Sequence, residues 1–316
     1  MPQSAWLCRG KSPKSVAAAR LTATTLYGAG PSFLNARVRH IMKTAFVTGA
    51  SSGIGEAIAR RLVADGYRVY AGARRVDRMA GLAADGAIPL SLDVTDDASM
   101  VAAVRRIEAE AGAVDVLVNN AGYGSYGALE EVPLEEGRRQ FEVNVFGTAR
   151  LTQLVLPAMR ERRSGAIVNI TSMGGKIYEP FGSWYHGTKF AVEGMSDCLR
   201  MELEPFGIRV IVIEPGAIIS DWSLIARDNL IEASGKGPYA KGAAVHARVL
   251  GNANTSIIAS PPEAVAKIVS RAVKARRPRT RYPAAGGAAP ILFLRKILSD
   301  RWFDGVMRLM MGGARA

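Results

Sequence analysis

The stretch Thr48-Gly-Ala-Ser-Ser-Gly-Ile-Gly55 decides the fold of this chain of 316 residues. It joins the apolar run Thr44–Thr48, which is typical of a strand, to Ile54–Asp65, whose apolar spacing is typical of a helix. Glycines let such a loop turn tightly and bring its backbone amides close to a pyrophosphate, and the helix presents its positive amino-terminal end to that anion. Glycine loops serve many other purposes, but between a strand and a helix this one predicts a dinucleotide site.

Strand-like and helix-like blocks alternate along the rest of the chain. Further strands are predicted by the apolar runs Tyr67–Ala71, Ala87–Leu92, Val114–Asn119, Ala166–Ile170, Ile208–Ile213 and Thr280–Tyr282. Further helices are predicted over Ala98–Ala111, Arg138–Arg160 with a break or an end near Pro157, Lys189–Pro205 and Glu263–Arg276. Apolar strands separated by helices are typical of a parallel sheet covered on both faces. We therefore expect an α/β fold, a single doubly wound parallel sheet of the Rossmann type with helices on both faces, as one domain over residues 42–316.

Composition and charge exclude several classes of protein. With 48% hydrophobic and 22% charged residues, the chain is neither a disordered nor a collagen-like protein. No apolar run approaches the roughly 18 residues of a membrane-spanning helix. The net charge of +13 suggests nucleic-acid binding, but six of the positive charges lie in the first 41 residues, and few aromatic side chains accompany the later basic cluster Lys274–Arg281. We therefore predict no nucleic-acid partner.

The first 41 residues differ from the rest of the chain. They contain no Asp or Glu and show no sustained period, so we expect them to be disordered. Their composition resembles an organelle transit peptide. The reading that we favour is that the folded protein begins at Met42 and that residues 1–41 are an over-extended or non-native start. Because two cysteines cannot form a disulfide framework, a cytoplasmic location is the default expectation.

Two more motifs accompany the glycine loop, Asn119-Asn-Ala-Gly122 and Tyr185-His-Gly-Thr-Lys189. Together with the loop they resemble the short-chain dehydrogenase/reductase family, and the likeness extends from about residue 43 to about residue 222. In general terms the chain resembles the steroid and retinol dehydrogenase branches of that family. The resemblance implies an NADP(H)- or NAD(H)-dependent oxidoreductase that interconverts a secondary alcohol and a ketone, or an alcohol and an aldehyde.

The resemblance also implies a cofactor site. Its residues on the matching segments are Gly49, Ser51, Ser52, Gly53, Ile54, Gly55, Asp93, Val94, Asn120, Ala121, Gly122, Pro215, Gly216, Ile218 and Ser220. NAD-binding members carry an acidic residue where this sequence has Ala73, followed by Arg74 and Arg75. Because Arg74 can bond a 2′-phosphate through a planar, charge-assisted fork, NADP(H) is predicted in preference to NAD. The competing reading is that both arginines are exposed charges after a strand.

The catalytic prediction depends on Tyr185 and Lys189, which share one face of a helix because they are four residues apart. A phenol with a pKa of about 10 is a poor base near neutrality. A neighbouring ammonium lowers that pKa, so Tyr185 is predicted to exchange a proton with an alcohol or alkoxide. By resemblance, Lys189 and Tyr185 also contact the cofactor, Ser172 bonds the substrate oxygen, and Asn144 holds a water that links Lys189 to solvent. The three histidines show no metal-ligand spacing, so no metal is predicted.

The substrate is predicted to be hydrophobic. Family geometry would put these apolar or aromatic residues around the reacting carbon: Ile177, Tyr178, Pro180, Phe181, Trp184, Trp222 and Leu224. They favour a steroid, a retinoid or a lipid-like alcohol or ketone, although core packing is the alternative role for several of them. The Gly- and Ala-rich segment Ser223–Pro261 is predicted to form a mobile substrate lid, with an ordinary surface excursion as the alternative.

The remaining predictions concern partners. Residues 290–311 have apolar side chains at helical spacing with basic residues among them. This tail could lie in a membrane interface, but helices of this kind more often cover a pocket or pack on another subunit. The resemblance implies a homodimer or homotetramer, formed through Arg138–Arg160 and Lys189–Pro205. A catalytically silent sensor or scaffold that binds NADP(H) is the competing function, which the set Ser172, Tyr185 and Lys189 disfavours.

Overall fold

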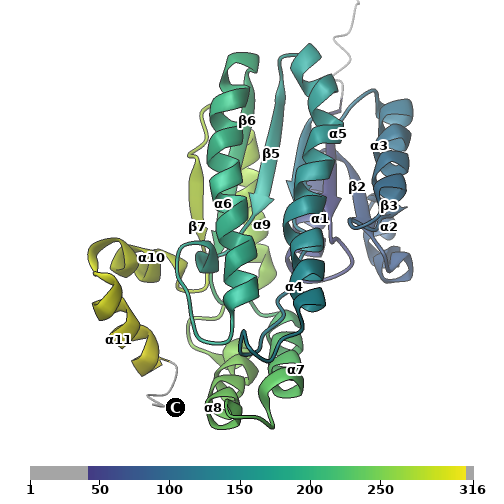
Figure 1. The fold of residues 1–316 in the computed structure, drawn as a ribbon. Helices are drawn as coiled ribbons and strands as arrows, with labels where there is room; N and C mark the ends of the chain where they lie inside the picture. Colours follow the sequence, from purple (N-terminus) through teal and green to yellow (C-terminus); the bar gives the residue numbers. More distant parts are fainter. Residues whose placement is uncertain (1–41, 311–316) are drawn as a thin grey trace, which may run out of the picture. The chain divides into compact units, whose positions relative to one another are not determined.

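The computed structural model describes residues 42–310, so the expected disorder of residues 1–41 lies outside the described part of the chain. The described residues form one parallel sheet with the strand order β3-β2-β1-β4-β5-β6-β7 (Figure 1). The strands are β1 Thr44–Thr48, β2 Arg68–Ala73, β3 Ile88–Ser91, β4 Val116–Asn119, β5 Gly165–Ile170, β6 Ile208–Pro215 and β7 Arg281–Ala284. The predicted fold class is confirmed.

Helices cover both faces of the sheet. In Figure 1, α5 and α6 lie in front of the sheet and α9 lies behind it. The helices are α1 Gly53–Ala64, α2 Ala80–Ala84, α3 Asp97–Ala111, α4 Leu134–Phe141, α5 Gly147–Glu161, α6 Ser183–Leu203, α7 Trp222–Ser234, α8 Ala240–Gly251, α9 Pro262–Lys274, α10 Ala288–Ile297 and α11 Asp300–Met310. None of these helices is both long and apolar enough to cross a membrane.

The two faces of the sheet have separate hydrophobic cores, and β1 shows how the sequence supplies both. Ala45 and Val47 pack in the core that includes α1 and α9, whereas Phe46 packs in the core that includes α3 and α5. Successive side chains of a strand point to opposite faces, so a strand buried on both sides is largely apolar; in β1 only the end residues Thr44 and Thr48 are polar. All five residues of β1 are buried.

Two predicted helix boundaries are wrong in ways that matter for the site. Helix α6 begins at Ser183 rather than at residue 189, so both Tyr185 and Lys189 lie in its first turns. The predicted helix Arg138–Arg160 breaks early, at a π-helical turn over Glu142–Phe146, and not at Pro157. Pro157 lies inside α5, where it cannot donate a backbone hydrogen bond, and its neighbours Val155 and Met159 are buried.

The segment predicted as a weakly periodic lid contains two regular helices, α7 and α8, which pack against each other. The buried residues of α7 include Ala226 and Leu230, and those of α8 include Ala243, Ala247 and Leu250. These spacings of three and four residues are helical. Three of the five positions are alanines. Because alanine is common at both buried and exposed positions, the sequence of this segment shows no clear helical period.

Candidate active site

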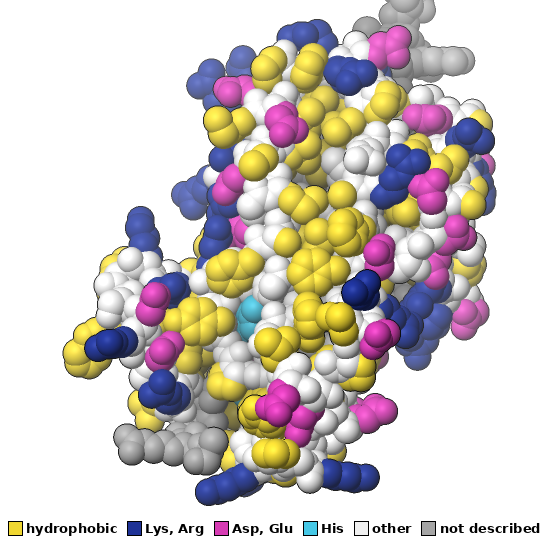
Figure 2. Space-filling model, in the orientation of Figure 1, with side chains coloured by type: hydrophobic (Ala, Val, Ile, Leu, Met, Phe, Trp, Pro, Cys, Tyr) yellow, Lys and Arg dark blue, Asp and Glu magenta, His cyan; other side chains and the backbone are white. Residues whose placement is uncertain are grey.

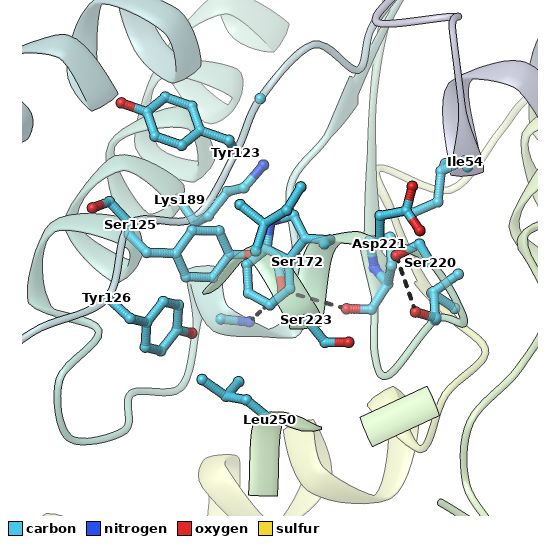
Figure 3. A pocket seen from close by; sticks show the side chains of 18 of the residues that line it. Ile54, Tyr123, Ser125, Tyr126, Ser172, Lys189, Ser220, Asp221, Ser223 and Leu250 are labelled. Carbon is cyan, nitrogen blue, oxygen red and sulfur yellow. Dashed lines mark hydrogen bonds between the residues drawn. The ribbon is translucent and has the colours of Figure 1, made fainter. Parts of the chain in front are cut away.

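A large cleft of about 1980 Å³ lies at the carboxyl ends of the strands. Parallel α/β sheets bind ligands at this edge. The predicted cofactor and catalytic residues that line it are Gly49, Ser51, Ser52, Gly53, Ile54, Arg74, Arg75, Asp93, Val94, Asn120, Ala121, Gly122, Ser172, Tyr185, Lys189, Pro215, Gly216, Ile218 and Ser220. Figure 3 shows Ser172 and Lys189 in the middle of the cleft, between Tyr126 on one side and Ile54 and Ser220 on the other.

The glycine loop brings the amino-terminal end of α1 to the cleft wall. Gly49 and Gly53 have φ angles of 66° and 57°, which side chains disfavour. Gly55 does not line the cleft but lies beneath the loop, where a Cβ would come within 2.3 Å of the carbonyl oxygen of Gly49. At the N-cap, Ser52 makes no side-chain capping bond to any described residue. The first amides of α1 therefore suit an anion, and this end of the cleft fits a dinucleotide pyrophosphate.

Hydrogen bonds fix the loop to the neighbouring strand β4. The hydroxyl of Thr48 accepts hydrogen bonds from the backbone N–H groups of Asn120 and Ala121, at 3.0 and 2.9 Å. In return, the side-chain amide of Asn120 donates to the carbonyl of Thr48 at 2.9 Å. Thr48 is buried. Through these bonds Thr48 and Asn120 hold the phosphate loop in place.

At the adenosine end of the cleft, two arginines and an aspartate lie together. Arg74 and Arg75 are both exposed, and Arg75 donates a hydrogen bond to the hydroxyl of Ser51 at 3.4 Å. Asp93 accepts hydrogen bonds from the backbone N–H of Thr95 at 2.9 Å and from its hydroxyl at 2.7 Å. These bonds, together with the charge of Arg74, lower the pKa of Asp93. The N-cap of α3 is Asp96, whose side chain accepts from the backbone N–H of Ala98, so Asp93 is not used as a helix cap.

The three predicted catalytic residues, Ser172, Tyr185 and Lys189, come from two elements, the loop after β5 and the first turns of α6. The hydroxyl of Ser172 accepts a hydrogen bond from the backbone N–H of Gly174 at 3.0 Å and is oriented by it. Tyr185 is buried, and the ammonium of Lys189 lies 5.9 Å from the centre of its ring. Lys189 donates to the backbone carbonyl of Ile170 at 3.0 Å. The structure therefore brings Ser172, Tyr185 and Lys189 together on one wall of the cleft.

The protein groups alone do not lower the pKa of the tyrosine. Burial raises the pKa of Tyr185 to about 12, and the Ser172 hydroxyl acts in the opposite direction. Burial also lowers the pKa of Lys189 to about 8, while Glu193 raises it. Burial disfavours the charged form of both groups. The expected lowering of the Tyr185 pKa by Lys189 is therefore not found: desolvation of the phenol sets the direction of the shift, and Ser172 is the group that opposes it.

Asn144 lies behind the cleft, on the π-helical turn between α4 and α5. Its amide donates hydrogen bonds to the carbonyl of Tyr123 at 2.9 Å and to the hydroxyl of Thr188 at 3.0 Å. Its oxygen accepts from the backbone N–H of Tyr123 at 3.1 Å. Asn144 does not line the cleft and instead joins three parts of the chain, α6, the turn and the loop after β4. The extra residue of a π turn is common at functional sites.

The loop after β6 forms the opposite wall and is held by a residue that sequence reasoning missed. The side-chain oxygen of Asn254 accepts from the backbone N–H of Ser220 at 3.1 Å, and its amide donates to the carbonyl of Ser220 at 2.9 Å. Ile218 pairs with Ser260 in a short parallel bridge. Residues 254 and 260 both belong to the predicted lid segment, so these hydrogen bonds and the bridge attach that segment to the loop after β6.

The predicted substrate wall is only partly correct. Ile177 and Trp222 line the cleft. The ring of Trp184 instead packs between α4 and α6, at 6.2 Å from the ring of Phe141. The remaining residues are also directed elsewhere: Tyr178 bonds Asp304 of α11, and Phe181 packs in the cluster with α8. Pro180 and Leu224 are likewise outside the lining.

Sequence reasoning also missed a polar cluster beside Tyr185. The hydroxyl of Tyr126 donates to a carboxylate oxygen of Glu179 at 2.6 Å, and Nε2 of both His186 and His246 lies 3.9 Å from that oxygen. The Tyr126 ring centre is 5.8 Å from that of Tyr185. Four separate segments contribute these residues, so no sequence motif could have revealed the cluster. Within residues 42–310, no group of three or more His, Cys, Asp and Glu side chains is arranged to hold a metal ion.

The comparisons with known proteins agree with this arrangement. The family model for the short chain dehydrogenases matches residues 43–228. A short-chain dehydrogenase from Streptomyces avermitilis, known from its crystal structure, is 35% identical and has a TM-score of 0.72; the match covers 87% of this chain and 99% of that one. The chain belongs to the short-chain dehydrogenase family. As a member of it, the protein is a nicotinamide-dependent oxidoreductase.

Two further relatives have names that describe a cofactor or a substrate. An alcohol dehydrogenase from the archaeon Thermococcus sibiricus, solved in complex with 5-hydroxy-NADP, is 28% identical with a TM-score of 0.62, over 77% of this chain and 97% of that one. A 3-ketodihydrosphingosine reductase of Bacteroides thetaiotaomicron is 42% identical over 170 residues, which are 54% of this chain and 62% of the relative.

Proposed function

We propose that the protein is an NADP(H)-dependent oxidoreductase that interconverts a hydrophobic alcohol and its ketone or aldehyde. The observation that carries the proposal is the position of Ser172, Tyr185 and Lys189 on the wall of a cleft whose other end is the phosphate loop. One cleft can therefore hold the dinucleotide and present the substrate to an acid–base group.

The chain's own residues divide the work between proton transfer and positioning. The nicotinamide supplies or accepts the hydride. The phenol of Tyr185 donates a proton to the carbonyl oxygen during reduction and takes it back during oxidation. The hydroxyl of Ser172 donates a hydrogen bond to the same oxygen and stabilises the charge that develops there. Lys189 binds the ribose, and the positive charge of the oxidised nicotinamide, when bound, would favour the phenolate form of Tyr185. Asn144 holds α6 against the turn before α5, and so fixes the position of Lys189 on that helix.

The preference for NADP(H) is supported by charge. Ala73 at the end of β2 is followed by Arg74 and Arg75, which line the cleft where the adenosine ribose would lie. A carboxylate at residue 73 would repel a 2′-phosphate, whereas an arginine bonds it through a charge-assisted fork. The Thermococcus relative in complex with an NADP derivative supports the same choice.

The hydrophobic substrate class is supported by Ile177, Tyr126, Trp222 and Leu250, which lie around the inner cleft. The Bacteroides reductase, whose name describes a long-chain keto lipid, supports it as well. Helices α7 and α8 border this region, and we assign them the role of substrate lid.

A cytoplasmic location of the protein remains a prediction.

We propose that the protein is a homodimer or homotetramer that assembles through the α5 and α6 face. Figure 2 shows hydrophobic side chains gathered over these two helices. Phe146, which directly precedes α5, is 55% exposed, and Phe190 and Met195 of α6 are 44% and 37% exposed. Contiguous apolar patches of this kind mark interaction sites.

The cofactor assignment is tested by a fluorescence titration of the purified protein with NADPH and with NADH. We expect tighter binding of NADPH, and the Arg74→Ala variant should weaken NADPH binding by about 10- to 100-fold, the value of a lost charge-assisted bond. NADH binding should stay nearly unchanged, because NADH has no 2′-phosphate.

Arg78→Ala is the matched control, because Arg78 is also exposed after β2 but does not line the cleft. It should leave both affinities unchanged. Equal losses for Arg74→Ala and Arg78→Ala would show a general effect of charge, and a preference of the wild-type protein for NADH would contradict the assignment.

A further inference from the structure

Helix α10 has an apolar stripe that faces outward. Pro290, Phe293, Leu294 and Ile297 recur at intervals of three and four residues, which places them on one face of the helix. Phe293 is 62% exposed, Leu294 is 37% exposed and Ile297 is 59% exposed. The opposite side of α10 is anchored through the buried residue Ile291. The outward stripe is thus not needed to pack this helix on the protein.

Helix α11 repeats the arrangement. Phe303 and Met307 are buried and form a cluster with Ile177 and Ile291. On the outside, Trp302 is 74% exposed and Leu309 is 79% exposed. The inner face is fixed further by the hydrogen bond from the hydroxyl of Tyr178 to Asp304, at 2.9 Å. Both tail helices therefore bury one face and expose large apolar side chains on another.

The charges around these stripes are mainly positive. Four basic residues, Arg295, Lys296, Arg301 and Arg308, accompany Asp300 and Asp304 on the two helices. Asp300 is paired with Arg295, and Asp304 accepts from Tyr178. Among the described residues, Lys296 and Arg301 form no salt bridge, and both are exposed. An occupant of this surface should therefore offer negative charge beside an apolar layer.

The tail also borders the cleft, since Ile291 and Met310 contribute to its lining. We infer that the outward face of α10 and α11 docks on the surface of an anionic phospholipid bilayer, with Phe293, Ile297, Trp302 and Leu309 in the interface. Amphipathic helices with exposed aromatic and basic residues bind membranes in this way. A symmetric contact with a second copy is disfavoured, because it would bring the unpaired Lys296 and Arg301 of both copies together.

The test is co-sedimentation of the full chain with vesicles. Phosphatidylcholine vesicles that contain phosphatidylglycerol should bind the protein at least about tenfold more tightly than pure phosphatidylcholine vesicles, since each basic residue near an anionic surface adds to binding. The double variant Ile297→Asp/Trp302→Asp should lose about tenfold or more of this binding, because two carboxylates would enter the interface. Its control, Leu129→Asp/Leu134→Asp, changes exposed apolar residues, 58% and 50% exposed, away from the tail helices and from the α5 and α6 face, and should bind like the wild type.

A second variant keeps the test independent of folding. Lys296→Glu/Arg301→Glu changes only exposed charges and should abolish the preference for anionic vesicles. Light scattering without vesicles completes the experiment. The inference is overturned if the wild type binds neither vesicle, if it binds both equally, or if Ile297→Asp/Trp302→Asp lowers the subunit number, which would identify the face as a contact between copies. NADPH binding, measured in parallel, separates all these results from the proposed oxidoreductase function.

Discussion

At the scale of single residues, Glu214 is a buried acid that the proposed reaction does not use. It lies on β6, next to Pro215 of the cofactor wall, and its side chain is 3% exposed. Burial, reinforced by the nearby charge of Glu193, raises its pKa to about 7. A carboxyl group whose pKa is raised in the folded state stabilises the protein while it is protonated.

This shift predicts a pH dependence of stability. Glu214 stabilises the fold fully below its unfolded pKa of about 4.5, and the contribution disappears as the pH rises through about 7. The Glu214→Gln variant cannot ionise, so relative to the wild type it should gain up to about 3 kcal/mol in free energy of unfolding between pH 5 and about pH 8. Urea unfolding of both proteins at the two pH values measures this. Parallel profiles would mean that Glu214 titrates normally.

Residues could be predicted from the sequence where a local spacing determines geometry. Tyr185 and Lys189 are four apart, so any helix brings them to one face. Trp184 was misplaced because adjacent residues on a helix point about 100° apart. Its ring therefore turns away from the cleft and packs on Phe141. The polar cluster of Tyr126, Glu179 and His246 could not be predicted at all, because it needs the tertiary fold.

At the scale of elements, Arg281 joins the edge strand β7 to helix α6. It donates to Glu193 at 2.9 Å and to Asp197 at 2.7 Å. Glu193 is 3% exposed in its side chain and also accepts from the hydroxyl of Thr171, the neighbour of Ser172. The arginine lowers the pKa of Asp197 to about 2. Arg281 thus balances the negative charge of two acids, one of which is bonded to Thr171, beside Ser172.

Removing this arginine should destabilise the protein strongly. In Arg281→Met the buried carboxylate of Glu193 loses its nearer cation and keeps only Lys176, at 3.3 Å. Breaking a buried ion pair from one side costs up to about 3–5 kcal/mol. Arg200→Met, which removes the surface partner of Asp197 on α6, should cost less than about 1 kcal/mol. Urea unfolding at neutral pH compares the two variants. A similar loss in the free energy of unfolding for both variants would show that Arg281 stabilises the protein no more than a surface arginine does.

At the scale of the whole molecule, the order of strands and helices followed from the sequence because each buried strand is a run of apolar residues. The position of the cleft followed as well, since parallel sheets bind ligands at their carboxyl edge. Helices α7 and α8 did not, because alanines form much of their buried faces. The tail was recognised as amphipathic, but only the structure shows that it buries one face and leaves another open.

We propose that Tyr185 is the acid–base group on which turnover of this oxidoreductase depends. The most direct measurement compares the wild type with Tyr185→Phe, using the hydrophobic ketone that the wild type reduces fastest, and measures NADPH binding separately. We expect kcat to fall by about 10²- to 10⁴-fold while the affinity for NADPH stays nearly unchanged. Tyr67→Phe, which removes a phenol outside the cleft, should keep full turnover. Unchanged turnover in Tyr185→Phe would show that Tyr185 is not the acid–base group.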